Sequence, residues 1–206
     1  FQIEKNTRDL MKQATGQLGR VSPERLRDEL FKVLEGPKPD TSIRALDMLG
    51  VLPHLLPELV ELKGVEQPSP HVYDVWTHTL AVLAELENIL LSLRVGYHAE
   101  EMNDLFTSLL ALRLGRYREQ IAEHFTESLN ADRSMRALLF FAALYHDVSK
   151  PQTKTIDENG RIRFFDHDIQ GADIVAERAR AFNLSNDEID RLKSIIRNHM
   201  RTHFFA

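Results

Sequence analysis

The stretch ALLFFAALYHDVSKP, residues 137–151, decides the fold class and raises the question of function. Nine apolar residues run without a break from Ala137 to Tyr145, a pattern typical of a helix that is buried on every side. A histidine and an aspartate, His146 and Asp147, follow at once. A buried carboxylate is unfavourable unless a cation or several donors hold it. The stretch therefore predicts a buried helix with a cation near its end.

The composition narrows the kind of protein and the kind of site. The chain has 206 residues, 43% hydrophobic and 28% charged, enough for one or two compact domains. A net charge of -5 argues against a bulk nucleic-acid binder, although it leaves room for a local basic patch. Cysteine is absent, so any metal must be held by histidines and carboxylates. Neither a run of about 20 apolar residues nor a signal-peptide pattern is present, so we expect a cytoplasmic protein without a membrane partner.

Start and stop signals predict helices along most of the chain. The apolar stripe formed by Val75, Val82, Leu86, Ile89 and Leu93 is typical of a core-facing helix surface. Five predicted helices span residues 23–36, about 41–49, 73–94, about 132–146 and 185–200. Residues 99–129 form one or two further helices with a joint at LGRYRE, and another helix starts near residue 166.

One segment breaks the helical pattern. KTIDENGRIRFF predicts a short β-hairpin near residues 153–164 that turns at the pair Asn159-Gly160. The loop GVEQPSP, residues 64–70, marks a boundary between an N-terminal and a C-terminal region. The predicted fold class is therefore all-α, with one short hairpin.

Four of the nine histidines lie on the apolar faces of four different predicted helices. They share this property by their spacing of three, four or seven residues from apolar neighbours, and they are His78, His146, His167 and His199. The plainer interpretation of each one is a core histidine with a single hydrogen-bond partner. Together with Asp147, they favour a divalent metal site, since neutral imidazoles and a carboxylate are its usual ligands. Such an ion would also offset the burial of Asp147.

The end of the buried helix suits a cation for two further reasons. The partial negative charge of a helix C-terminus favours a cation there. Lys150 lies three residues beyond Asp147 and would face the same site. It is either a solvated lysine before a proline or a contact for a phosphate oxygen.

The histidine series and its local context resemble the HD superfamily of metal-dependent phosphohydrolases. The segments that carry this resemblance are, in order, YDVWTHTL, ALYHDVSKP, FFDHDIQGA and IIRNHM. Their context is similar to the HD region of bacterial tRNA nucleotidyltransferases (CCA-adding enzymes) and poly(A) polymerases. VSPERLRDELFKVL and ALDMLGVLPHLLPEL resemble the neck helices of the same enzymes. The resemblance implies a helical neck at residues 1–65 and an HD domain at 66–206 with a helical insertion around 96–131.

The resemblance also implies roles for the residues. His78, His146 and Asp147 would hold a first divalent ion, whether Mg, Mn, Ni, Co, Fe or Zn, and His167 and His199 would be extra ligands for a second. Asp147 and Lys150 are then the catalytic residues, with Lys150 neutralising charge on the phosphoryl group. The substrate would be a phosphomonoester, a nucleotide or a 2′,3′-cyclic phosphate, and water the nucleophile.

The sequence departs from the family pattern at several points. The nucleotidyltransferase head is missing, and Phe1 stands where a complete chain would have Met, so we expect a piece of a longer protein that does not transfer nucleotides by itself. The segment from Asn88 to Asp132 is long for the family. No final aspartate ligand follows His199, so that ligand would lie beyond the sequence, or Asp168 or Asp173 would replace it.

Two other functions stay open at this point. The HD region would be a non-catalytic module that positions tRNA, or the chain would be a freestanding HD nucleotide hydrolase, which leaves the neck motif unexplained. For tRNA the candidate contacts are Arg25, Arg113, Arg116 and Arg118, with Tyr117 as a stacking group. A solvated helix face explains the same arginines without RNA.

Overall fold

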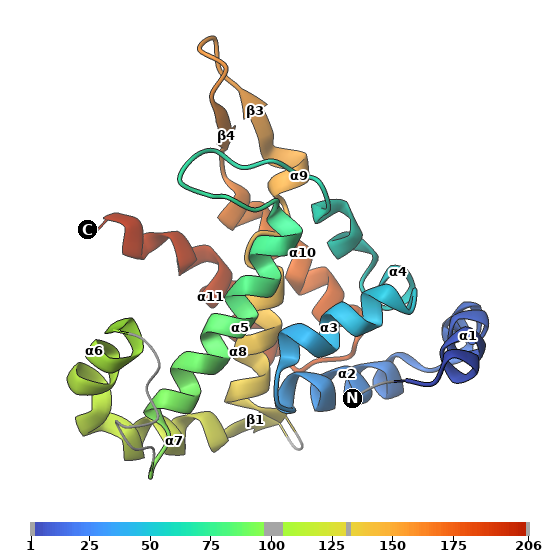
Figure 1. The fold of residues 1–206 in the computed structure, drawn as a ribbon, viewed down its shortest axis with the longest axis horizontal. Coiled ribbons are helices and arrows are strands. Elements are labelled where there is room, and N and C mark those ends of the chain that lie inside the picture. Colours follow the sequence, from blue (N-terminus) through green and yellow to red (C-terminus); the bar gives the residue numbers. More distant parts are fainter. Residues whose placement is uncertain (1–2, 97–104, 131–132, 205–206) are drawn as a thin grey trace.

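The computed structural model describes residues 3–96, 105–130 and 133–204, and the side chains of all of these except 107 and 202–204. The described part is built from helices, with two short antiparallel strand pairs (Figure 1). In chain order the elements are α1 Lys5–Ala14, η1 Thr15–Arg20, α2 Pro23–Glu35, α3 Pro39–Met48, α4 Leu52–Leu55, η2 Pro57–Leu62, α5 Val75–Leu93, α6 Leu105–Leu114, η4 Gly115–Tyr117, α7 Arg118–Thr126, β1 Ser128–Asn130, β2 Arg133–Ser134, α8 Met135–Tyr145, α9 Lys150–Thr153, β3 Lys154–Ile156, β4 Ile162–Phe164, α10 His167–Ala181, α11 Asn186–Asn198 and η5 His199–Phe204.

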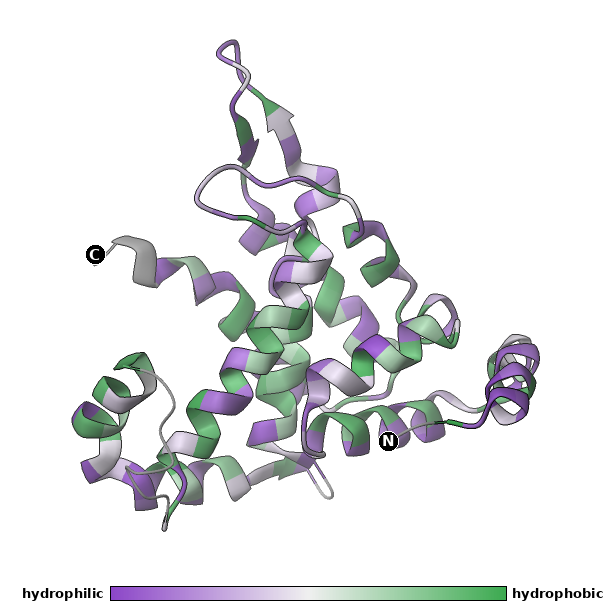
Figure 2. Ribbon diagram, viewed as in Figure 1, coloured by the Kyte–Doolittle hydropathy of each residue, from purple (hydrophilic) through white to green (hydrophobic). Residues whose placement is uncertain are grey.

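The predicted buried helix is α8, and it lies at the centre of the fold. Helices α2, α5 and α11 all pack against α8, and α10 packs on α11 (Figure 1). Phe140, Phe141 and Tyr145 are fully buried. One hydrophobic cluster runs from α2 through α5 and α8 to α11, and hydrophobic residues are concentrated on these central helices (Figure 2). The all-α prediction is confirmed.

Side-chain caps explain where several helices begin. The Ser134 hydroxyl accepts the Ala137 amide, so α8 begins at Met135 instead of near residue 132. Ser134 is also the last residue of strand β2, and the β1–β2 pair was not predicted. The predicted capping box of α11 is present, because the Ser185 hydroxyl and the Glu188 carboxylate bond each other's backbone amides.

The hairpin is present and turns around Asn159-Gly160, but its loop is longer than the predicted two-residue turn. Strands β3 and β4 pair in antiparallel register from Lys154↔Phe164 to Ile156↔Ile162. The connection is therefore residues 157–161 and not a two-residue turn. The Asp157 carboxylate accepts the amides of residues 159 and 161, which closes this longer loop. The hairpin projects from the helical body beside α9 (Figure 1).

The predicted core stripe of α5 is only partly buried, which corrects the sequence-based interpretation. Val75 and Leu93 lie in the core, but Val82, Leu86 and Ile89 are intermediate in exposure. The core-facing residues of α5 are instead Val75, Trp76, Thr79, Leu80, Leu83 and Glu87. Periodicity identified an apolar face, and the packing of α3, α6 and α8 decided which part of α5 is covered.

One buried and one partly buried ionic group join elements that are far apart in the sequence. Arg133 Nε and Nη2 donate to the two oxygens of Glu188 at 2.6 and 2.9 Å, and both side chains are at most 6% exposed. The Glu58 carboxylate accepts Arg178 Nε and Nη2 at 2.8 Å each and the Tyr145 hydroxyl at 2.5 Å. These groups tie β2 to α11, and η2 to both α8 and α10.

Replacing Glu188 by Ala should lower the free energy of unfolding by about 3–5 kcal/mol, because Arg133 would remain buried without its partner. Urea denaturation of the two proteins measures the difference. The matched control is Glu29→Ala, since Glu29 pairs with Lys32 on the surface and both side chains are at least 70% exposed. Equal losses in both variants would contradict the assignment of a stabilising buried pair.

Replacing Glu58 by Gln should have an effect that depends on pH. Burial raises the pKa of Glu58, but hydrogen bonds from Arg178 and Tyr145 outweigh it and hold the pKa below 4.5. A depressed carboxyl pKa contributes stability above the unfolded value, and this contribution disappears as the pH falls through the folded value. We expect a loss of about 2 kcal/mol at pH 7 that shrinks below pH 4.5.

Urea unfolding at pH 7, 5 and 4 measures this difference. Glu123→Gln, at an exposed position on α7, is the control and should show no trend. A difference between wild type and Glu58→Gln that stays constant over this pH range would refute the role of the ionised carboxylate.

Candidate metal centre

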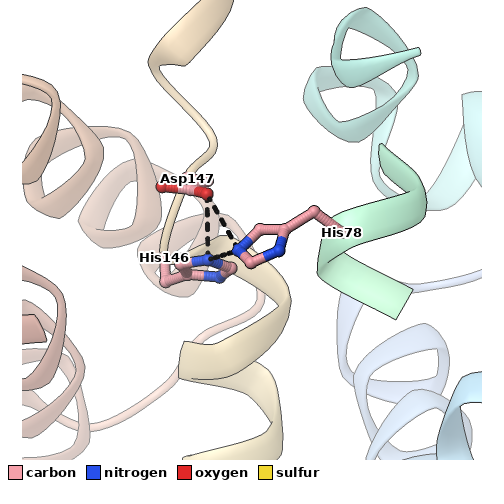
Figure 3. A group of neighbouring side chains, drawn as sticks. All are labelled: His78, His146 and Asp147. Carbon is pink, nitrogen blue, oxygen red and sulfur yellow. Dashed lines mark hydrogen bonds and ion pairs between the residues drawn. The ribbon is translucent and has the colours of Figure 1, made fainter. Parts of the chain in front are cut away.

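Four histidines and one aspartate from four helical elements meet at one point. His78 comes from the first turn of α5, His146 is the C-cap residue of α8, His167 opens α10, and His199 caps α11. Asp147 follows α8 and is only 2% exposed. Figure 3 shows His78 reaching from α5 toward the His146–Asp147 pair.

The histidines divide between the two carboxylate oxygens of Asp147. Oδ2 lies 3.0 Å from His146 Nε2 and 3.7 Å from His78 Nε2. Oδ1 lies 3.7 Å from His167 Nε2 and 3.8 Å from His199 Nε2. Two triads that share Asp147 thus have ligand atoms close enough for a metal ion. They are His78–His146–Asp147 and Asp147–His167–His199.

Backbone carbonyls fix the orientation of three of the four rings. In each case Nδ1 lies within hydrogen-bond distance of the carbonyl three residues earlier, namely His146 to Ala143 at 2.7 Å, His167 to Phe164 at 2.9 Å and His199 to Ile196 at 2.6 Å. A carbonyl only accepts, so Nδ1 carries the proton and the Nε2 lone pair faces Asp147. This arrangement is typical of metal-ligating histidines.

Two of these lone pairs lack a hydrogen-bond donor among the described residues. Nε2 of His167 and Nε2 of His199 are buried and have no hydrogen-bond partner in that part of the chain. The Nε2 atoms of His78 and His146 lie only 3.4 Å apart. Buried acceptors that face one another and a carboxylate need a cation between them. The donor set therefore fits a divalent metal ion.

The pKa shifts of the rings in the metal-free centre go in different directions. Burial and the neighbouring His146 lower the pKa of His78 to about 4, so this ring is neutral at pH 7. Burial also lowers the pKa of His167. Burial acts the same way on His146, but the Asp147 carboxylate overrides it and raises the His146 pKa above 6.5. Burial disfavours the Asp147 anion, yet His146, His199 and Lys150 hold its pKa well below 3.8.

Lys150 is a buried partner of Asp147, with its side chain 8% exposed. Its ammonium donates to Asp147 Oδ2 at 2.8 Å and to Gln67 Oε1 at 2.6 Å. It also lies 5.2 Å from the centre of the Phe164 ring. Lys150 thus faces the same site as Asp147, as predicted, and is not a solvated lysine.

Close contacts hold the helices that carry the candidate ligands in place. The Asp74 carboxylate accepts the amides of Thr77 and Gly64, which fixes the start of α5 one turn before His78. The buried Ser149 hydroxyl donates to the His167 carbonyl at 2.6 Å. A Cβ at Gly171 would lie 3.6 Å from that hydroxyl oxygen and 3.4 Å from Ile196, so a glycine suits this close approach of α10.

The other acidic candidates lie apart from the centre. Asp173 is exposed and lies 3.8 Å from Lys193 and 3.7 Å from Arg197. Neither Asp168 nor Asp173 belongs to a potential metal group within the described ranges. A substitute for the missing final aspartate is therefore not found among these residues.

The arginines proposed for RNA contact differ in their surroundings. Arg25, Arg113 and Arg116 are exposed, and Arg116 lies 4.7 Å from the Tyr117 ring centre. Arg118 is partly buried, and its Nη2 donates to the Ser92 carbonyl at 3.4 Å, which attaches α7 to the end of α5. RNA contact by these arginines stays a prediction.

Two residues near the centre were not identified from the sequence. Gln67 reaches Lys150 from a loop interpreted only as a domain joint. The His71 ring lies 5.1 Å from that of His78. The only signal for His71 is its spacing of seven residues before His78, and a single loop glutamine carries no signal at all.

Comparisons with known proteins divide the chain into two matched regions. Residues 1–62 match the family model described as the probable RNA and SrmB-binding site of polymerase A. Residues 75–204, more than half of the chain, match the HD domain. None of the described helices has the length and apolar character that a membrane span requires.

Similar proteins include longer chains, two of them tRNA nucleotidyltransferases. The A-adding tRNA nucleotidyltransferase of Deinococcus radiodurans is 28% identical over 206 residues, which cover 97% of this chain and 38% of the relative. The CC-adding enzyme of Thermus thermophilus is 28% identical over 86% of this chain and 31% of its own length. The multifunctional CCA protein of Vibrio parahaemolyticus is 36% identical over 51% of this chain and 27% of its own length.

The chain thus spans about a third of the length of the first two relatives. Its matches follow the order of the neck and HD motifs seen in the sequence, and the HD histidines are the residues that meet at Asp147. The chain belongs to the HD domain family and is a region related to tRNA nucleotidyltransferases.

Proposed function

We propose that this region is a metal-dependent phosphohydrolase of the HD type that acts on a phosphomonoester or a 2′,3′-cyclic phosphodiester. The observation that carries the proposal is the placement of four histidine Nε2 atoms around both oxygens of one buried aspartate. A purely structural cluster would have donors for these lone pairs. The region would form the C-terminal part of a longer tRNA nucleotidyltransferase-like protein.

In this proposal His78, His146 and Asp147 hold one divalent ion, and His167 and His199 complete a second group through the other oxygen of Asp147. When bound, a divalent ion polarises a phosphoryl oxygen and lowers the pKa of a coordinated water. The carbonyls that accept from Nδ1 keep the rings aimed at Asp147. The chain has no cysteine nucleophile, which favours water as the attacking group.

The position of Lys150 supports a role different from the predicted phosphate contact. Asp147 and Gln67 already engage its ammonium, and the side chain is buried. Lys150 would therefore act as a positioning residue that orients the Asp147 carboxylate and balances its charge.

A second function, tRNA positioning, is supported by the match of residues 1–62 to an RNA-binding region and by the tRNA substrates in the relatives' names. We propose residues 1–65 as the neck and 66–206 as the HD domain, with an insertion around 96–131. Exposed Arg25, Arg113 and Arg116 would contact phosphates, whereas Arg118 is committed to Ser92. This function does not require metal.

Protein purified without a His-tag or chelator should contain up to two equivalents of a divalent metal. Asp147→Ala should lose all of it, because both groups share this carboxylate. His78→Ala and His167→Ala should each weaken one group. Each change should lower phosphoesterase kcat by at least about 100-fold, since the metal supplies several kcal/mol to such reactions. Plasma mass spectrometry and an assay with 2′,3′-cyclic AMP measure both quantities.

His54→Ala is the matched control, because His54 is exposed on α4, outside the centre. It should keep both metal content and activity. Wild-type protein that binds no manganese, nickel or magnesium would refute the hydrolase, and retained tRNA affinity in that protein would favour the positioning function.

Lys150→Met should destabilise the metal-free protein by about 2–4 kcal/mol, because Asp147 loses a buried cationic partner. Added metal should restore part of this loss, since the ion then balances the carboxylate. Thermal unfolding with and without metal, together with steady-state kinetics, tests this role. A raised KM with unchanged stability and metal content would instead support the predicted contact with phosphate.

A further inference from the structure

The β3–β4 hairpin projects from the helical body and carries a row of exposed side chains that the proposed hydrolysis does not use (Figure 1). Arg161, Arg163 and Phe165, here called the outer row, are exposed, whereas the alternating residues Ile162 and Phe164 are partly buried. Phe165 is 64% exposed, although phenylalanine is among the most often buried residues. Alternate residues of an extended chain point to the same face, about 7 Å apart. The outer row therefore spans about 13 Å of the hairpin.

The opposite face of the hairpin is turned toward the helical body. Lys154 and Phe164 are paired across the two strands, so their side chains share this inner face. Lys150 Nζ lies 5.2 Å from the centre of the Phe164 ring. Lys154 Nζ lies 3.9 Å from Glu66 Oε2, in the loop before α5. Arg163 belongs to the next pair of the ladder and is exposed, so it lies on the face that meets solvent.

The two arginines of the outer row carry positive charge that the hairpin balances only in part. Asp157 Oδ2 lies 3.6 Å from Arg163 Nε, which is too long for a hydrogen bond. The other oxygen of Asp157 already accepts the amides of Asn159 and Arg161. Glu158 is exposed at the tip of the hairpin. The guanidinium groups can therefore exchange a weak pairing for a stronger one with a phosphate, whose oxygens match their fork of donors.

Guanidinium groups beside an exposed aromatic ring fit single-stranded RNA. The arginines pair with backbone phosphates, and an unpaired base stacks on the Phe165 ring. The bases of a duplex are already stacked on one another, so a duplex gains nothing from this ring. An acidic peptide would pair with the arginines but would bring no planar base to the ring. The two kinds of side chain together thus select an unpaired strand.

We propose that the outer row is an arm that binds single-stranded RNA. Arg161 and Arg163 contact neighbouring phosphates, and Phe165 stacks on an unpaired base. The arm ends close to the candidate metal centre, because Phe165 precedes His167 by two residues. It is nevertheless independent of metal, since neither arginine nor phenylalanine is a metal ligand. The proposal concerns binding and does not depend on the proposed hydrolysis.

Fluorescence anisotropy with a labelled oligoadenylate decamer at several salt concentrations tests the arginines. The double variant Arg161→Ala/Arg163→Ala should bind about tenfold more weakly than wild type. The slope of log affinity against log salt concentration should become smaller by about 1.4, because each phosphate contact on a single strand contributes about 0.7. Arg180→Ala/Arg191→Ala is the matched control, since both residues are exposed and Arg180 lies at the end of α10 far from the hairpin. It should keep both affinity and slope.

The same assay tests the aromatic ring and the tip. Phe165→Ala should weaken binding about tenfold without changing the salt slope, because stacking involves no charge, and Phe165→Trp should restore the affinity. Leu112→Ala, at a position 80% exposed on α6, controls for the loss of an exposed apolar side chain. Glu158→Lys should strengthen binding several-fold, since it replaces the repulsive charge at the tip.

Cross-linking and chelation identify where the RNA binds. RNA that contains thiouridine should cross-link to the hairpin, with and without EDTA. Cross-links confined to residues 1–62, with unchanged affinity in the hairpin variants, would overturn the arm. Binding that disappears in EDTA would place the RNA at the metal centre and would also overturn it. Duplex RNA that binds as tightly as the single strand would refute the role of Phe165.

Metal content separates this proposal from the hydrolase. Arg161→Ala/Arg163→Ala should contain as much metal as wild type by plasma mass spectrometry, because the arm supplies no ligand. RNA binding that depends on the arm, in a protein that holds no metal, would support the arm and refute the hydrolase. Unchanged RNA affinity in the arginine and Phe165 variants of a metal-loaded protein would refute the arm alone.

Discussion

The buried carboxylate of Asp147 is the constraint on which the arrangement of the molecule depends. Its oxygens sit at the end of an almost entirely apolar helix, where an isolated negative charge is strongly unfavourable. The chain surrounds it with one ammonium and four imidazoles drawn from α5, α8, α10 and α11. The helices that pack around this point also direct their ends toward it. The packing of the helices and the geometry of the centre therefore depend on each other.

Helix ends are well suited to this task. His146 and His199 occupy C-cap positions, and each ring bonds a carbonyl of its own last turn. These carbonyls lack full partners within the helix, so the bond satisfies the backbone and orients the ring at the same time. The negative end of the helix dipole also favours a cation. The same local geometry thus stabilises the fold and prepares the ligands.

Packing around the centre leaves one side open. Helix α5 carries apolar residues around much of its surface, but α3, α6 and α8 cover only part of them. The remaining face, with Val82, Leu86 and Ile89, continues from His78 along an open groove. The candidate metal centre and the apolar face of α5 are therefore contiguous, which is the arrangement that small-molecule sites commonly have.

The sequence by itself determined the features that depend on neighbours three or four residues apart. These include the helical pattern, the Ser185–Glu188 capping box and the inward faces of the four histidines, because backbone hydrogen bonds in a helix repeat over that distance. Only the tertiary structure decided that Lys150 meets Gln67, that Arg133 meets Glu188, and that the α5 stripe stays uncovered. Such contacts join residues far apart in the chain, and burial depends on which helices pack together, which local periodicity does not encode.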